Sequence, residues 1–209
     1  TPISVIRANS ETLSSTGAIK DPKLAEKFLN SILNNSERLS AMLDDLLELE
    51  KIEFGGLVLN RKKFNVYDQI DLILESQQAL ADENNIIITN YIDKNISLKV
   101  DKDSFTTIFS NLINNSIKYS RKDGNVAIKA LQNKDALIIS ITDKGLGIEK
   151  QYLNKVFNRF YRTPKARANT KGTGLGLSLV KQLASRMNAE AEVESKIGKG
   201  TTVFVTFPT

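Results

Sequence analysis

The spacing of apolar residues in the first quarter of the chain constrains its fold more than any other feature. Between Phe28 and Leu49 the stripe positions advance by four and three residues in alternation, which predicts a single long helix. Asp21 and Pro22 supply an N-cap and a first helical residue. Further leucines widen the stripe beyond what one helical hairpin can bury, so two hairpins are predicted to pair into a four-helix bundle: Leu29, Leu33, Leu43 and Leu47.

Breaks in this pattern set the expected domain boundaries. A shorter helix over residues 3–16 precedes the long one, and Gly55 with Gly56 ends it. We therefore expect a helical hairpin at 1–56, a linker at 57–63 and a second domain at 64–209.

The second domain is predicted to be an α/β sandwich with a mixed sheet, which makes the whole chain α+β. Its helices are separated from strands whose side chains alternate, and two pairs of neighbouring strands are predicted to form hairpins. The expected helices are 65–84, 103–119 and 175–187, and the expected strands are 86–92, 96–100, 126–131, 136–143, 189–195 and 201–207.

Composition excludes several classes of protein. The 209 residues include no Cys and no His, which excludes disulfides and metal sites built on thiolates or imidazoles. The longest apolar runs fall short of the roughly 18 residues of a membrane span. Because the chain opens abruptly on Thr1 and Pro2, we expect it to be a piece of a longer protein.

Five polar or glycine-rich segments follow one another in the second domain. We name them the Asn segment (111–119), the Asp segment (143–147), the aromatic segment (157–162), the glycine segment (172–177) and the hairpin segment (198–201). Each is weakly specific alone, so their order and proximity carry the argument.

The Asn segment places Asn111, Asn115 and Lys118 at i, i+4 and i+7, on one face of a helix. Amide oxygens are hard ligands that suit Mg²⁺. In the Asp segment, Asp143 ends an apolar strand before two glycines, where a buried carboxylate can accept the amino hydrogen of adenine. An Asn-rich surface helix and an ordinary turn are the alternative interpretations of these two segments.

The glycine segment precedes a helix whose first amide hydrogens attract phosphate. It lacks the Lys-Ser/Thr pair of a P-loop and does not follow a strand, so both the P-loop and the dinucleotide fingerprint are excluded. A structural turn remains the alternative. The basic stretch 158–171 is predicted to be a mobile lid, and the hairpin segment is predicted to be a tight turn.

The charge of the chain is concentrated near these segments. Its net charge is +5, and residues 151–189 hold eight of the 29 Lys and Arg residues but none of the 24 Asp and Glu residues. A local basic excess favours a compact polyanion such as a nucleoside triphosphate over a long nucleic acid. A solvated face with a mobile loop is the alternative.

The five segments, in this order behind a heptad hairpin, resemble the core of the sensor histidine kinases of two-component systems. The resemblance covers nearly the whole chain and implies the ATP-binding fold of the GHKL (Bergerat) class, with transfer of the γ-phosphate of Mg-ATP to a histidine and then to an aspartate of a response regulator. It also implies a homodimer and the cytoplasmic portion of a membrane-anchored bacterial sensor, with no nucleic acid as partner. Ser116 stands where the family usually has Ala.

The same resemblance assigns roles to individual residues. Asn115 is expected to bind the metal, and Tyr119 to pack on adenine. Phe157 and Phe160 are expected to anchor the lid, with a place in the core as the alternative. The catalytic residues implied are Asn111, Lys118, Arg162 and Thr1, and the ATP-binding residues are Asn111, Asn115, Lys118, Tyr119, Asp143, Gly145, Gly147, Lys171, Gly172, Thr173, Gly174, Leu175, Gly176, Leu177 and Thr201.

The family's phosphoaccepting segment reads His-Glu-X-Arg-Thr-Pro, and this chain opens on its last two residues, Thr1 and Pro2. We expect the histidine to lie just before Thr1, so that this chain binds Mg-ATP without phosphorylating itself. A gyrase-type ATPase is disfavoured because the helix of the Asn segment has no carboxylate after Asp103. A non-catalytic nucleotide-binding dimer, or pseudokinase, is the remaining alternative.

Overall fold

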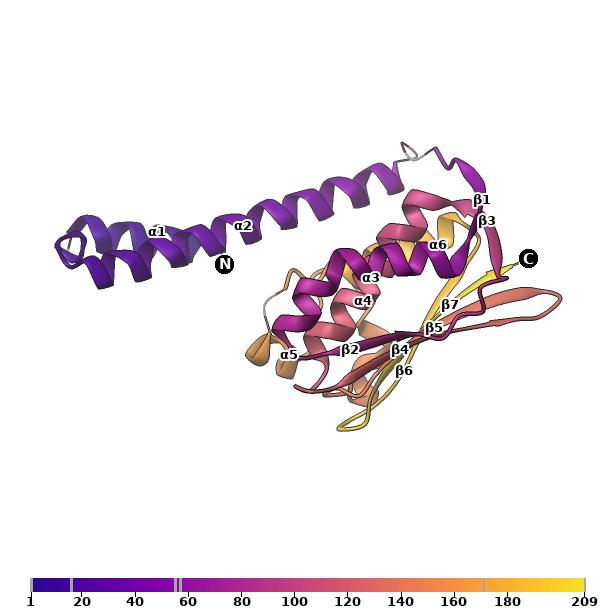
Figure 1. Cartoon of the computed structure of the whole chain (residues 1–209). Helices are drawn as coiled ribbons and strands as arrows, with labels where there is room; N and C mark the ends of the chain where they lie inside the picture. Colours follow the sequence, from indigo (N-terminus) through magenta and orange to yellow (C-terminus); the bar gives the residue numbers. More distant parts are fainter. Residues whose placement is uncertain (1, 16, 55, 57, 171, 209) are drawn as a thin grey trace. The chain divides into compact units, whose positions relative to one another are not determined.

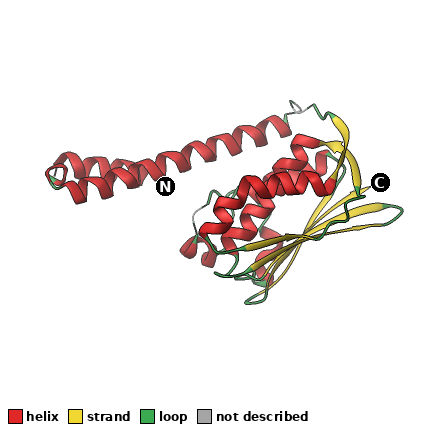
Figure 2. Ribbon diagram, viewed as in Figure 1, coloured by secondary structure: helices red, strands yellow, loops and turns green. Residues whose placement is uncertain are grey.

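The computed structural model describes residues 2–15, 17–54, 56, 58–170 and 172–208. It divides the chain into two compact units, residues 1–48 and 49–209. Figures 1 and 2 show a helical first part and a sheet with helices in the second. None of the helices among the described residues is long and apolar enough to cross a membrane.

The first unit is the predicted helical hairpin. Helix α1 (Pro2–Ser15) and the short 3-10 helix η1 (Ala18–Lys20) lead into α2 (Pro22–Glu53), most of which lies in this unit. The Asp21 carboxylate accepts a hydrogen bond of 3.0 Å from the Lys23 amide, which confirms the N-cap. The leucines that widen the stripe are exposed, at 56% for Leu29, 58% for Leu33, 52% for Leu43 and 58% for Leu47.

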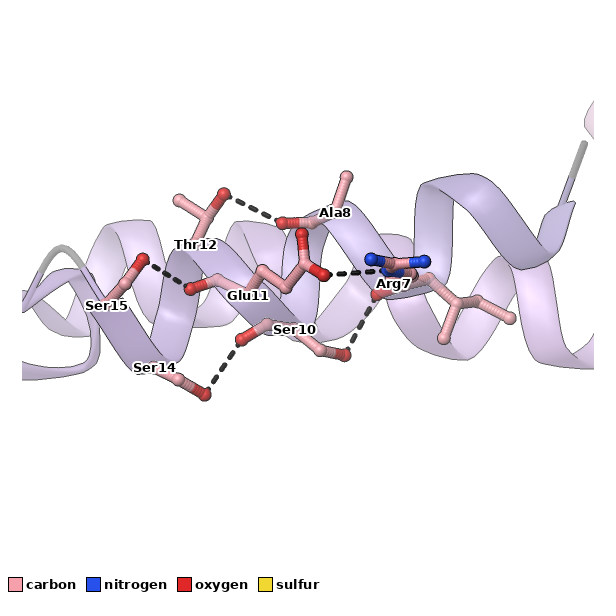
Figure 3. A network of polar contacts seen from close by, with 8 residues as sticks. Arg7, Ala8, Ser10, Glu11, Thr12, Ser14 and Ser15 are labelled. Atoms are coloured by element: carbon pink, nitrogen blue, oxygen red, sulfur yellow. Dashed lines mark hydrogen bonds and ion pairs between the residues drawn. The ribbon is translucent and has the colours of Figure 1, made fainter.

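Helix α1 also carries a polar side, shown in Figure 3. Arg7 and Glu11 form an ion pair of 2.7 Å, one turn apart. The hydroxyls of Ser10, Ser14 and Ser15 donate to backbone carbonyls four residues earlier. Hydroxyls that bond within their own helix need no partner elsewhere, so this side is compatible with solvent.

A mixed five-stranded sheet organises the second unit. The order is β2-β4-β5-β7-β6, with β2 parallel to β4 and every other pair antiparallel. Figure 1 shows α3, α4 and α6 together on one side of this sheet, as predicted for an α/β sandwich. The strands are β2 (Ile87–Asn90), β4 (Asn125–Gln132), β5 (Ala136–Asp143), β6 (Glu190–Lys196) and β7 (Gly200–Pro208), and the helices are α3 (Val66–Glu83), α4 (Lys102–Tyr119) and α6 (Gly176–Arg186).

Besides η1, three elements were not predicted from the sequence. Strand β1 (Arg61–Asn65) pairs with β3 (Ser97–Asp101) in a separate two-stranded sheet. The 3-10 helix η2 (Lys150–Lys155) and helix α5 (Pro164–Asn169) lie between β5 and α6. The residues of β1 read Arg-Lys-Lys-Phe-Asn and lack the apolar alternation by which a strand is predicted. The strand forms because its backbone pairs with β3.

The core of the second unit lies between the sheet and its helices. Phe105 and Phe109 are fully buried, with ring centroids 4.4 Å apart. Leu49 and Ile52, in the last turn of α2, are buried in the same core at 0% and 2% exposure. The compact second unit therefore begins inside α2, and β1 begins within the range 57–63 expected as a linker.

Candidate functional site

The glycine segment meets the Asn segment at the start of α6. A Cβ atom placed on Gly176 would lie 2.7 Å from Asn111 Oδ1 and 3.8 Å from Asn115 Nδ2. Glycine leaves room for these two amides beside the helix start. The structure therefore brings the Asn111 and Asn115 side chains next to the N-terminus of α6, which lies about sixty residues later in the sequence. A helix N-terminus is a site where phosphate can bind.

The Asn segment forms the last turns of α4 and has the two predicted faces. Asn111 and Asn115 are half-buried and Lys118 is exposed, whereas Leu112 and Ile117 are buried. Asn111 Nδ2 donates to the Thr107 carbonyl of its own helix at 2.9 Å. This bond orients the amide so that its oxygen, which can ligate a metal or accept a hydrogen bond from water, faces Gly176.

Ser116, where Ala is usual, lies on the same helix with 6% exposure. Its small hydroxyl side chain is accommodated there, and its carbonyl accepts from the amide of Ser120, the residue that ends the helix.

Asp143 is the buried carboxylate expected at the end of β5. It is 6% exposed, and Oδ1 accepts hydrogen bonds from the amides of Gly145 at 2.8 Å and Thr201 at 3.2 Å. Burial raises the pKa of this carboxyl, and the two amide donors oppose that rise. A carboxylate fixed by two backbone donors has a defined direction in which to accept a further hydrogen bond.

The glycines around Asp143 are set by close backbone contacts. A Cβ on Gly145 would lie 2.1 Å from the Tyr119 carbonyl oxygen, and Leu146 donates to the same oxygen at 3.2 Å. Gly147 has a positive φ of 65°, and its Cβ would lie 2.1 Å from the Lys196 carbonyl. The Asp segment is therefore wedged between the end of α4 and the β6–β7 hairpin.

Arg162 does not extend into open space in this structure. Its guanidinium donates to the carbonyls of Gly172, at 3.2 Å, and Ala166, at 2.7 Å, and to Thr170 Oγ1 at 3.0 Å. Thr163 caps α5 by accepting from the Ala166 amide at 3.2 Å. The stretch predicted as a mobile lid thus contains a short capped helix tied to one arginine.

The aromatic segment is not buried as a core. Phe160 is 50% exposed and has a positive φ of 60°, and Phe157 is half-buried with Lys181 Nζ 5.9 Å from its ring centre. Gly174, with φ of 79°, packs against the backbone of Phe160, where a Cβ would lie 2.8 Å from the carbonyl carbon. The aromatic and glycine segments are therefore in backbone contact. The exposure of Phe160 excludes the alternative that it belongs to the core.

Two arginines of the basic region bind the end of α2. Arg159 forms an ion pair with Glu53, and Arg186 Nε donates to the Ile52 carbonyl at 3.0 Å. Gln182 also donates to Glu53 at 3.0 Å. Arg159 is thus paired with a carboxylate, whereas Arg162 and Arg186 donate to neutral carbonyls and keep their charge.

Other predicted residues are also located. Leu175 is buried, while Thr173 and Leu177 are half-buried beside the start of α6. Thr1 and Lys171 lie outside the described residues. No cluster of three His, Cys, Asp or Glu side chains suited to a metal occurs among the described residues. Sequence reasoning missed Ser195, because a lone strand serine carries no motif.

Comparison with protein families gives a match over both units. Residues 100–209 match the family model of the histidine kinase-, DNA gyrase B- and HSP90-like ATPases. Residues 1–55 match the model of the His Kinase A (phospho-acceptor) domain.

Individual proteins agree with these matches. Sensor histidine kinase WalK of Bacillus subtilis (strain 168) is 33% identical over 211 residues, which cover 100% of this chain and 34% of that protein. The chain thus spans about a third of that relative's length. The solved structure of Acinetobacter baumannii histidine kinase AdeS has a TM-score of 0.78 at 21% identity, covering 100% of this chain and 95% of that one. Histidine kinase ThkA, solved in complex with response regulator protein TrrA, has a TM-score of 0.82 at 20% identity, covering 100% of this chain and 57% of that one.

Proposed function

This chain belongs to the sensor histidine kinase family, and we propose that residues 64–209 bind Mg-ATP for phosphoryl transfer to a histidine. Residues 1–56 are proposed to form the dimerisation hairpin, joined to the ATP-binding domain through 57–63. The observation that carries the ATP proposal is the buried carboxylate of Asp143, whose Oδ1 is fixed by two backbone amides.

The residues present fit a magnesium nucleotide. Asp143 is proposed to accept the adenine amino hydrogen, and Tyr119, half-buried at the end of α4, to pack on the base. Asn115 is proposed to ligate Mg²⁺ through its amide oxygen, since an amide oxygen is a hard donor and the Asn115 amide lies beside the start of α6. When bound, Mg²⁺ neutralises phosphate charge and thereby assists departure of the leaving group.

The remaining residues are proposed to hold the phosphates. Amides at the start of α6, from Leu175 to Leu177, and the side chains of Asn111 and Lys118 are proposed to bind and orient them. Backbone from Gly172 to Gly174, with Lys171 and Thr173, completes the proposed phosphate set. Thr1, in the helical hairpin, is proposed to help orient the water that removes the phosphate from the response regulator. These groups position charge and substrate, which is most of what phosphoryl transfer requires of a protein.

The acceptors of the phosphate are proposed from the relatives. The chain contains no histidine, so the phosphorylated histidine must be supplied by another segment or chain. A response-regulator aspartate is proposed as the next acceptor, since ThkA was solved with a response regulator. The intact sensor is proposed to be a homodimer whose kinase core faces the cytoplasm, which fractionation of the full-length protein tests.

The lack of histidine also favours a second candidate, a nucleotide-binding signalling module without kinase activity. Labelled ATP separates the two when a histidine-bearing family hairpin is added in trans. Acid-labile label on that hairpin supports the kinase, and nucleotide binding without any transfer supports the module. Label on this chain itself would contradict both.

Titration of the chain with ATP by calorimetry, with and without Mg²⁺, tests the binding proposal. Asp143→Asn and Asn115→Ala are each expected to weaken Mg-ATP binding about tenfold to a hundredfold, as for loss of a charge-assisted contact. Asn30→Ala is the control, because Asn30 is an exposed amide on α2 in the first unit, outside the ATP-binding domain. Binding that needs neither Mg²⁺ nor these two residues would overturn the proposal.

A further inference from the structure

Ser195 lies where two backbone segments around Asp143 meet. It is in β6, directly opposite Thr201 of β7. Its Oγ accepts a hydrogen bond of 2.8 Å from the Ile148 amide and lies 2.8 Å from the Gly200 carbonyl oxygen, to which it donates. Thr201 Oγ1 is 2.9 Å away. A hydroxyl has one hydrogen and two acceptor sites, so this set of three partners saturates it.

The partners of Ser195 are the two arms that hold the Asp143 carboxylate. Thr201, on one arm, donates its amide to Asp143 Oδ1 at 3.2 Å. Ile148, on the other, follows the turn whose Gly145 amide donates to the same oxygen at 2.8 Å. One hydroxyl therefore closes a ring of contacts that runs from the carboxylate through each arm and back.

This ring has little slack. A Cβ on Gly200 would lie 1.9 Å from the Asp143 carbonyl oxygen, and one on Gly147 would lie 2.1 Å from the Lys196 carbonyl. The Gly198 amide also donates to the Leu146 carbonyl at 2.9 Å. Segments in backbone contact transmit a shift of a few tenths of an ångström directly, so the spacing that Ser195 sets reaches the carboxylate.

We propose that Ser195 is a positioning residue that sets the direction of the Asp143 carboxylate and, through it, the selectivity of the site for adenine over other purines. The proposal deepens the ATP-binding function proposed above and rests on it. Ser195 itself touches no nucleotide in this scheme. Its hydroxyl fixes the separation of the two amide donors, and the donors aim the free lone pairs of the carboxylate.

The first test compares ATP with inosine triphosphate, in which an oxygen replaces the 6-amino group. Calorimetric titration of the unaltered chain is expected to show preference for ATP. In Ser195→Ala the affinity for ATP is expected to fall about threefold to tenfold, the range for one hydrogen bond, with the affinity for inosine triphosphate unchanged. Ser195→Thr keeps a hydroxyl and is expected to restore the preference.

Thr202→Val is the matched control. Thr202 is the next residue of β7, and its hydroxyl bonds to Thr142 Oγ1 at 3.0 Å, apart from the ring. This variant is expected to keep the ATP preference of the unaltered chain. Ser195→Cys, which keeps the side-chain shape with a much weaker donor, replaces the alanine variant if that one does not fold.

A second test needs no nucleotide. Carbon-13 NMR of the carboxyl group follows the titration of Asp143 in the unaltered chain and in Ser195→Ala. Without the Ser195 hydroxyl, the Thr201 amide is expected to move away from Asp143 Oδ1. The pKa of Asp143 is then expected to rise, because that amide stabilises the ionised form. A role in strand stability alone would lower the melting temperature and leave this titration unchanged.

The outcomes separate the two proposals. If the unaltered chain shows no preference for ATP, the assignment of Asp143 to adenine fails, whatever Ser195 does. If the unaltered chain prefers ATP while Ser195→Ala keeps both that preference and the Asp143 titration, the positioning role of Ser195 is overturned.

Discussion

Asp143 carries its carboxylate at 6% exposure, where burial raises its pKa. The folded-state pKa therefore lies above the unfolded one. The stability linked to this group is complete below the unfolded pKa and is lost as the pH rises through the folded pKa. At neutral pH the ionised side chain thus destabilises the nucleotide-free domain.

Asp143→Asn removes this ionisation, so we expect the variant to melt above the unaltered chain at neutral pH while it binds ATP more weakly. The difference in melting temperature is expected to vanish at acidic pH, below the unfolded pKa. Calorimetric melting over a pH series measures it. A variant that melts lower at neutral pH, or a difference independent of pH, would contradict this account of the site.

The hairpin glycines differ in what a side chain would meet. Gly200 has a φ of 112° and no room beside the Asp143 backbone, whereas a Cβ on Gly198, with a φ of 71°, is 3.6 Å from the nearest atom, in Arg121. We expect Gly200→Ala to cost more than about 3 kcal/mol, since backbone must move, and Gly198→Ala about 1–2 kcal/mol from φ alone. Urea denaturation compares them, and equal losses would show that the close contact does not matter.

At the scale of elements, Arg162 organises the stretch between the aromatic and glycine segments. Its guanidinium bonds to carbonyls of Ala166 and Gly172 and to the Thr170 hydroxyl. A lysine ammonium keeps the charge but not the planar fork that reaches several acceptors at once. The role of Arg162 as a tie for the lid depends on the guanidinium, so it is expected to be lost in Arg162→Lys.

In Arg162→Lys we expect faster amide hydrogen exchange over residues 163–170 in the nucleotide-free chain, by about tenfold, the effect of losing one to two net hydrogen bonds. Exchange elsewhere in the second unit should not change. Arg167→Lys, at an exposed position of α5, is the control. Unchanged exchange in Arg162→Lys would show that the tie contributes nothing to lid order.

At the scale of the whole molecule, the first unit leaves apolar surface uncovered. Four leucines of α2 are each more than half exposed, and they form two pairs one turn apart on the same side of the helix: Leu29 with Leu33 and Leu43 with Leu47. Such a row on a hairpin matched by the His Kinase A family model fits pairing with a second copy.

We expect the chain to sediment as a dimer at micromolar concentration. Replacing Leu33 and Leu43 together by Gln is expected to raise the dissociation constant by at least about a hundredfold, since each removes a buried side chain worth about 1.5–3 kcal/mol. Ile87→Gln removes an apolar side chain of the second unit that is 69% exposed, and it is the control. Analytical ultracentrifugation measures both, and a monomeric unaltered chain would refute the pairing.

Local signals in the amino-acid sequence account for much of the fold. The heptad spacing, the Asp21 cap and the strand alternation are local signals, and the structure confirms the hairpin, α3, α4 and the mixed sheet. The order of the five segments indicated the family, because residue types and their spacing can be read from the sequence without the fold. Asp143 was also correctly predicted to be buried, as the last residue of an apolar strand.

Which residues contact one another depends on long-range packing and is seen only in the tertiary structure. Pairing of β1 with β3 has no local signal, and the close approach of Gly176 to Asn111 joins positions remote in sequence. Burial and partner choice depend on such distant contacts, so the sequence did not show that Arg162 ties the lid or that Ser195 links both arms around Asp143. Local chemistry chose the groups of the site, and long-range packing decided their directions.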